Sequence, residues 1–123
     1  LYDPDDLKWA IDQGITIIST DKFYEIGMEE TIKIIKDVLE DTSTYFTFDI
    51  DGIDPTFAPG TGTPEVGGIT VREAQLIIRH LNSLNFIGAD VVEVSPPFDV
   101  NNMTSLVGAT IAFEILCTMT KTN

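Results

Sequence analysis

The chain alternates short apolar runs with longer amphipathic segments, and this alternation constrains its fold more than any other feature. Three runs rich in β-branched or aromatic residues, at 15–20, 45–50 and 89–94, are predicted to be strands. Helical patterns separate them, and a connection that contains a helix joins parallel strands. The sequence therefore predicts an α/β fold in which right-handed βαβ units build a parallel sheet.

Two helices are expected before the second strand. The first begins after the N-cap Asp3, with Pro4 at its first position, and ends near Gly14. The second carries an apolar stripe at three- and four-residue steps, formed by Met28, Ile32, Ile35 and Leu39.

Two more helices follow the second strand. Thr70 and Glu73 form a capping-box pattern at the start of one, whose apolar face is Val71, Ala74, Ile78 and Leu81. The last helix, near 104–120, is apolar nearly all round. We therefore expect it to be buried on several sides, with Cys117 as one of its core residues.

Length and composition describe one acidic domain. The 123 residues suffice for one domain core, and no linker or repeat divides them, so 1–123 is treated as one unit. Twenty acids against seven bases give a net charge of −13, which argues against nucleic acids and anionic membranes as partners. We expect a cytoplasmic protein, since there is no signal-peptide pattern and no disulfide pair.

The start of the sequence and the edges of the predicted sheet suggest a longer chain or an oligomer. The sequence enters a helix almost at once without an initiator methionine, as a piece of a longer chain would. Three strands also leave open sheet edges, and we therefore expect missing chain or a homo-oligomer.

Carboxylates collect where two predicted strands end. Asp49 and Asp51 end the second strand, and Glu93 ends the third. In open parallel sheets, ligands bind outside the carboxyl ends of the strands. Two carboxylates with Cα atoms roughly 6.5 Å apart repel each other, and a cation such as Mg²⁺, Mn²⁺ or Ca²⁺ removes that cost.

Three other interpretations compete for the acidic motif. An EF-hand loop is excluded because its fifth and twelfth positions would be Ile53 and Gly60, which carry no oxygen ligand in their side chains. "FDIDG" also resembles the nucleophile motif of haloacid-dehalogenase-like phosphatases, but that motif usually continues with threonine. The acids could instead only cap a turn, which explains Asp54 before Pro55 well and a strand ending in two acids less well.

The longer stretch "FDIDGIDPTFAPGTGTPEVGG" closely resembles the signature of the ureohydrolase family, which includes arginases and agmatinases. "GADVVEVSPPFD" resembles the later glutamate-bearing strand of that family, and the helix from Thr104 to Thr118 resembles its closing helix. The resemblance covers essentially the whole chain and corresponds to the C-terminal part of the family. It implies a three-layer α/β/α fold with a parallel sheet.

The resemblance also implies a function. Two manganese ions would activate water for attack on a guanidinium carbon, releasing urea and an amine; agmatine is the favoured substrate, which would place the protein in polyamine metabolism. Asp49 would bridge both ions, Asp51 would bind one, and Glu93 would pair with the guanidinium nitrogens. Gly60 and Gly62 would let the backbone approach the metal pocket.

The chain departs from the family pattern in its histidines. The family needs further metal-binding histidines and aspartates from earlier strands. The single histidine here, His80, sits in an amphipathic helix and is expected to be a surface or packing residue and not a metal ligand. The chain alone is therefore not expected to catalyse. The competing hypothesis is a non-catalytic interaction module that retains the fold.

Overall fold

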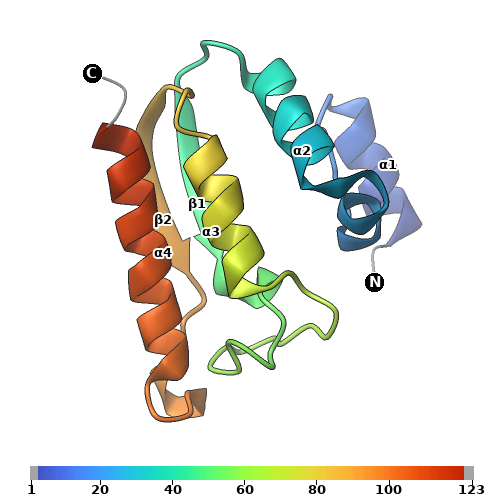
Figure 1. Cartoon of the computed structure of the whole chain (residues 1–123). Coiled ribbons are helices and arrows are strands. Elements are labelled where there is room, and N and C mark those ends of the chain that lie inside the picture. Colours follow the sequence, from blue (N-terminus) through green and yellow to red (C-terminus); the bar gives the residue numbers. More distant parts are fainter. Residues whose placement is uncertain (1–2, 121–123) are drawn as a thin grey trace.

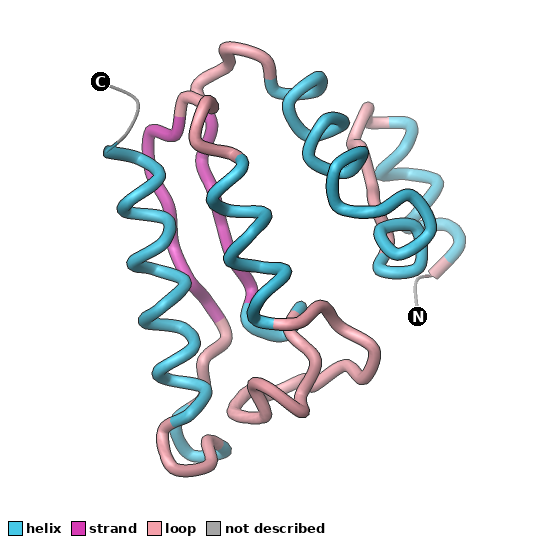
Figure 2. The backbone as a smooth tube through the Cα atoms, viewed as in Figure 1, coloured by secondary structure: helices cyan, strands magenta, loops and turns pink. Residues whose placement is uncertain are grey.

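The computed structural model describes residues 3–120 and confirms an α/β fold with a parallel sheet (Figure 1). The strands β1 and β2 pair in parallel, and Asp49 opposite Val92 is the last pair of the ladder. Figure 2 shows the two strands side by side with helices in front of them. The elements in order are α1 (Pro4–Asp12), α2 (Thr20–Leu39), β1 (Thr44–Asp49), the 3₁₀ turn η1 (Ile50–Gly52), α3 (Val71–His80), β2 (Phe86–Val92), the 3₁₀ turn η2 (Pro96–Phe98) and α4 (Met103–Thr120).

The helices α3 and α4 lie against one face of the sheet. Along β1 the side chains alternate, so that Phe46 and Phe48 pack into the core while Tyr45 and Thr47 stay exposed on the other face. The helix α2 packs against α3. Of the three layers expected for the family, the described residues therefore build the sheet and the helical layer on one side.

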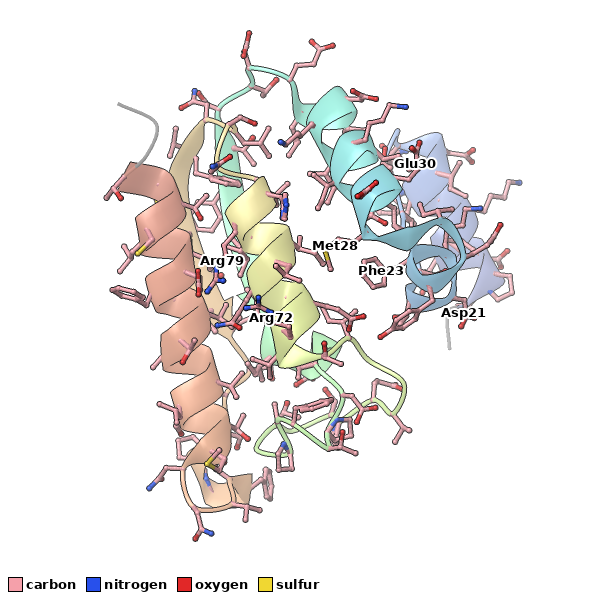
Figure 3. All side chains as sticks on the ribbon, in the orientation of Figure 1. Asp21, Phe23, Met28, Glu30, Arg72 and Arg79 are labelled. Atoms are coloured by element: carbon pink, nitrogen blue, oxygen red, sulfur yellow. The ribbon has the colours of Figure 1, made fainter. Side chains whose placement is uncertain are left out.

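The core is aliphatic and lies between the sheet and the two helices. Ile50 and Ile111 are completely buried, and the remaining fully covered members of the cluster are Ile53, Ala58, Ala74, Ile78 and Ile115. Arg79 of α3 also binds Glu114 of α4 through two hydrogen bonds, which ties the two helices together; Figure 3 shows Arg79 extending from α3 toward α4. The core thus fixes α3 and α4 relative to the strand ends.

The prediction of a strand at 15–20 is wrong. Residues 15–19 have no regular structure, and Thr20 already belongs to α2. A strand needs a partner for its backbone groups, and this segment lies along α2, where Thr16 and Ile18 line an apolar groove with Ile34 and Ile35. Figure 2 shows it apart from both strands. The sheet of the described residues consequently has two strands instead of three.

The third predicted strand exists but is displaced. The strand β2 covers Phe86–Val92 instead of 89–94. Since β2 ends at Val92, Glu93 is the first residue after the ladder of paired strand residues.

Two helix starts and two apolar stripes, those of α2 and α3, were predicted correctly. Asp3 caps α1, and Thr70 and Glu73 form the expected capping box on α3. The apolar stripe of α2 packs against Leu81 and Leu84 in the turn that follows α3, and Met28 points toward α3 in Figure 3. The helix α2 is interrupted at Gly27, whose φ of 81° is in the left-handed region that favours glycine.

The prediction that α4 is buried on several sides is wrong. One stripe is buried: Thr104, Gly108, Ile111, Ile115 and Thr118. The opposite face includes Leu106 and Phe113, which are 60% and 66% exposed, and Cys117 is half-buried. In length and composition α4 is the one described helix that could cross a membrane. Its packing on β2 and α3 is that of a helix covering a sheet.

Candidate functional site

Asp49 and Asp51 lie together at the turn where β1 ends. Oδ1 of Asp49 accepts a hydrogen bond from the backbone N–H of Asp51 at 2.9 Å, which holds the chain in the turn η1. The hydroxyl of Thr63 donates to Oδ2 of Asp51. The other oxygen of this carboxylate, Oδ1, is buried and has no hydrogen-bond partner.

Both carboxylates line an open cleft of about 670 Å³. Its other walls are the start of α2 and the end of the following loop: Ser19, Thr20, Asp21, Gly52, Glu65, Val66, Gly67 and Gly68. Figure 3 shows Asp21 at the beginning of α2. The described residues add no basic side chain to this wall. The cleft is therefore suited to cations.

The loop that follows Asp51 is closed at its base. Ile53 and Ile69 form a parallel bridge, and Gly68 passes so close to the backbone of Gly52 and Asp54 that an added Cβ would lie 2.6 Å from it. Asp54 accepts hydrogen bonds from Thr56 and from the N–H of Gly67. The hydroxyl and N–H of Thr56, together with Gly67, hold the pKa of Asp54 below its usual value. Asp54 is thus a turn former, as predicted.

Glu93 lies at the same edge of the sheet as Asp49. It directly follows Val92, which pairs with Asp49. Its φ of 65° is in the left-handed region, which is uncommon for glutamate. The side chain is exposed and does not line the cleft that holds Asp49 and Asp51. The structure therefore brings the two aspartates together and places Glu93 beside them at the strand ends.

The two loop glycines, Gly60 and Gly62, have different surroundings. Gly60 closely approaches the segment that leads into α4: an added Cβ would lie 2.8 Å from Cα of Asp99 and 2.9 Å from Cβ of Thr104. A Cβ on Gly62 would meet no atom of the described residues within 4 Å. His80 is exposed, and its Nδ1 lies 2.7 Å from the carbonyl oxygen of Leu76, as befits a surface residue.

Several contacts around the site were not predicted. The sequence did not reveal that the hydroxyl of Thr63 donates to the carboxylate of Asp51. Thr61 has a buried hydroxyl without a partner. The contacts of Asp99 and Thr104 were not predicted, although an acid a few residues before a predicted helix is the usual signal of an N-terminal cap.

The aspartates fit part of a metal site. Among residues 3–120, no three Asp, Glu, His or Cys side chains gather closely enough to hold an ion by themselves. The buried, unpaired Oδ1 of Asp51 nevertheless has the chemistry of a cation ligand, because leaving such an oxygen without a partner is costly. A metal bound here would need further ligands from outside these residues.

Comparison with known proteins gives consistent matches. A model of the arginase family matches residues 1–118. The guanidinopropionase of Pseudomonas aeruginosa is 52% identical over 117 residues, which cover 95% of this chain and 37% of that protein. The agmatinase of Photorhabdus laumondii is 46% identical over 105 residues, which cover 85% of this chain and 34% of that protein.

A solved structure agrees with these matches. The proclavaminate amidino hydrolase from Streptomyces clavuligerus superimposes with a TM-score of 0.93 at 36% identity, covering 95% of this chain and 40% of that one. The chain thus spans little more than a third of the length of the relatives that it matches.

Proposed function

Because the chain belongs to the arginase family, we propose that the complete protein is a ureohydrolase that converts a guanidino substrate and water into urea and an amine. The observation that carries this proposal is the buried, unpaired Oδ1 of Asp51, beside Asp49 in the acidic cleft at the carboxyl edge of the sheet. Family membership leaves the phosphatase hypothesis without support.

Asp49 and Asp51 are proposed to hold manganese, with two ions in the complete protein. The carboxylate oxygens of both residues are hard ligands of the type that Mn²⁺ prefers. When bound, the ions supply a water of lowered pKa and positive charge against the charge that develops during hydrolysis. Thr63 keeps Oδ2 of Asp51 in place, so that Oδ1 is presented in a fixed orientation.

Glu93 is proposed to bind and orient the guanidinium group. A carboxylate and a guanidinium form paired, charge-assisted hydrogen bonds, which fix the plane of the substrate. Water adds to the guanidinium carbon, the bond from that carbon to the substituted nitrogen breaks, and a proton passes to the departing amine. Holding the carbon in one place contributes to the rate without any chemical step at Glu93 itself.

Agmatine is the proposed substrate. Its tail carries a positive amine, and Asp21 and Glu65 give the cleft two further negative charges. The guanidinopropionase relative shows that a carboxylate-bearing substrate belongs in the same test. We further propose a cytoplasmic homo-oligomer that acts in polyamine metabolism. It is proposed to bind neither nucleic acid nor membrane, because its strongly negative charge repels both.

The test is urea release by the complete protein from agmatine, arginine, guanidinobutyrate and guanidinopropionate, with and without Mn²⁺. We expect Mn²⁺-dependent release, fastest from agmatine. Asp51→Ala should abolish turnover and lower the manganese content, and Asp49→Asn should weaken manganese binding. Glu93→Ala should retain both ions and lose substrate positioning. Asp37→Ala, which removes an exposed acid of α2, is the matched control.

The competing function is a non-catalytic interaction module, which is favoured by the incomplete ligand set among the described residues. A complete protein that binds manganese but releases no urea from any of the four guanidines would establish this alternative in place of the enzyme.

A further inference from the structure

We propose that Thr104 and Asp99 are positioning residues, which hold the loop that follows Asp51 and the segment that carries Glu93 in one fixed arrangement through the backbone of Gly60. This inference rests on the proposed function of Asp51 and Glu93. Neither Thr104 nor Asp99 lines the cleft.

Gly60 is the point where three segments meet. Its N–H donates to Oγ1 of Thr104 at 2.8 Å, and its carbonyl oxygen accepts from the N–H of Ser95 at 2.8 Å. Thr104 is completely buried, and the fit is tight enough that an added Cβ on Gly60 would lie 2.9 Å from Cβ of Thr104. Both backbone groups of one glycine thus connect α4 to the segment that follows β2.

Asp99 fixes Thr104 from the other side. Oδ1 of Asp99 accepts from the N–H of Thr104, and Oδ2 accepts from the N–H and the hydroxyl of Ser105, each at 2.8 Å. These bonds satisfy backbone donors that the start of α4 leaves free. The hydroxyl of Thr104 is therefore held where the N–H of Gly60 meets it.

The arrangement reaches both functional segments within a few residues. Ser95 follows Glu93 by two positions, and Thr63, which holds Asp51, follows Gly60 by three. The left-handed backbone of Glu93 is not an intrinsically favoured conformation, so the surrounding contacts must maintain it. The bond from Ser95 to Gly60 is one of these contacts. Thr104 therefore sets the position of Glu93 relative to Asp51 without touching either residue.

The test compares Thr104→Val with Thr104→Ser in the complete protein, with manganese content measured for each. Valine keeps the shape and removes the acceptor, and leaves the N–H of Gly60 buried without a partner. We expect KM for the guanidino substrate to rise roughly tenfold in the valine variant, as loss of one buried hydrogen bond predicts. Manganese content should stay at the wild-type level, and serine should restore KM.

The pattern of kinetic constants separates positioning from plain stability. A purely structural role lowers the folded fraction, which reduces kcat per total enzyme and leaves KM unchanged. That result, or a serine variant as impaired as the valine variant, would overturn the inference. A crystal structure of the valine variant gives a readout without activity: the bond between Gly60 and Ser95 should open and the φ of Glu93 should change.

The two proposals can fail separately. If the wild-type protein releases no urea, the proposed function fails, and the crystal structure alone decides whether Thr104 positions Glu93. If the wild type is active and the valine variant matches it in KM and in backbone geometry, the positioning role is wrong and the function stands.

Discussion

Replacing Gly60 by alanine should destabilise the protein, whereas the same change at Gly62, two residues later, should not. Neither glycine has a positive φ, so alanine is free of backbone strain at both positions and only the space around the new Cβ differs. At Gly60 that Cβ would lie 2.8 Å from both Cα and Cβ of Asp99. Carbon atoms in contact normally lie about 3.5–4.0 Å apart.

The expected magnitude follows from the missing space. The loop and the start of α4 must separate by roughly 0.7 Å or more to restore normal contacts. Overpacking of this kind costs about 1–3 kcal/mol. At Gly62 the new Cβ meets open space among the described residues, and the smaller entropy of the unfolded chain should give a gain of about 0.4–1 kcal/mol. The two variants should therefore shift stability in opposite directions.

Calorimetric unfolding of the wild type and the two variants at one concentration measures this difference. Gly60→Ala should lower Tm, and Gly62→Ala should leave Tm equal or higher. If Gly60→Ala were as stable as Gly62→Ala, the tight junction between the loop and α4 would not exist, and the positioning role of Thr104 would lose its geometric basis.

Two further predictions concern α4 and its cap. Burial raises the pKa of Asp99, but hydrogen bonds from the backbone N–H groups of Ser105 and Thr104 and from the Ser105 hydroxyl outweigh it and hold the pKa well below its usual value. The pKa of Asp99 is lower in the folded than in the unfolded protein, so ionised Asp99 stabilises the folded state fully above the unfolded pKa of about 3.9. This stabilisation is lost as pH falls below that value. The stability gap between wild type and Asp99→Asn, measured by thermal unfolding from pH 7 to pH 3, should therefore shrink below about pH 4, and a constant gap would contradict this account. Ile111 is completely buried, so Ile111→Ala should lower the free energy of unfolding by about 2–5 kcal/mol in calorimetry. Phe113 is 66% exposed, so Phe113→Ala should change it by less than about 0.5 kcal/mol. Equal losses in the two variants would refute the packing of α4.

Features formed by residues that are close in the sequence, such as helix caps, could be predicted from the sequence. The capping box of Thr70 and Glu73 and the N-cap Asp3 depend on neighbours within three residues, and both formed as predicted. The sharing of one sheet edge by Asp49 and Glu93 also followed from the sequence, because the carboxyl ends of parallel strands lie on the same side.

Features that depend on distant partners were not predictable in the same way. The β-branched run at 15–20 has strand propensity, yet propensity does not supply a neighbouring edge, and the segment packs along α2 instead. The apolar composition of α4 could not reveal which of its faces meets the sheet. The bond between Gly60 and Thr104 joins residues 44 positions apart, and only the folded backbone brings them together.

The short helix α1 has no buried residue, although its two ends are well formed. Nine residues are too few for a helix to be stable in water through its own hydrogen bonds. In this chain α1 should therefore open and close largely independently of the sheet, and its amides should exchange with deuterium long before those of β1 and α4. Lys8 lies in the middle of α1, so among the lysines and arginines of residues 3–120 it should be the first that trypsin cuts, leaving the remainder of the fold intact.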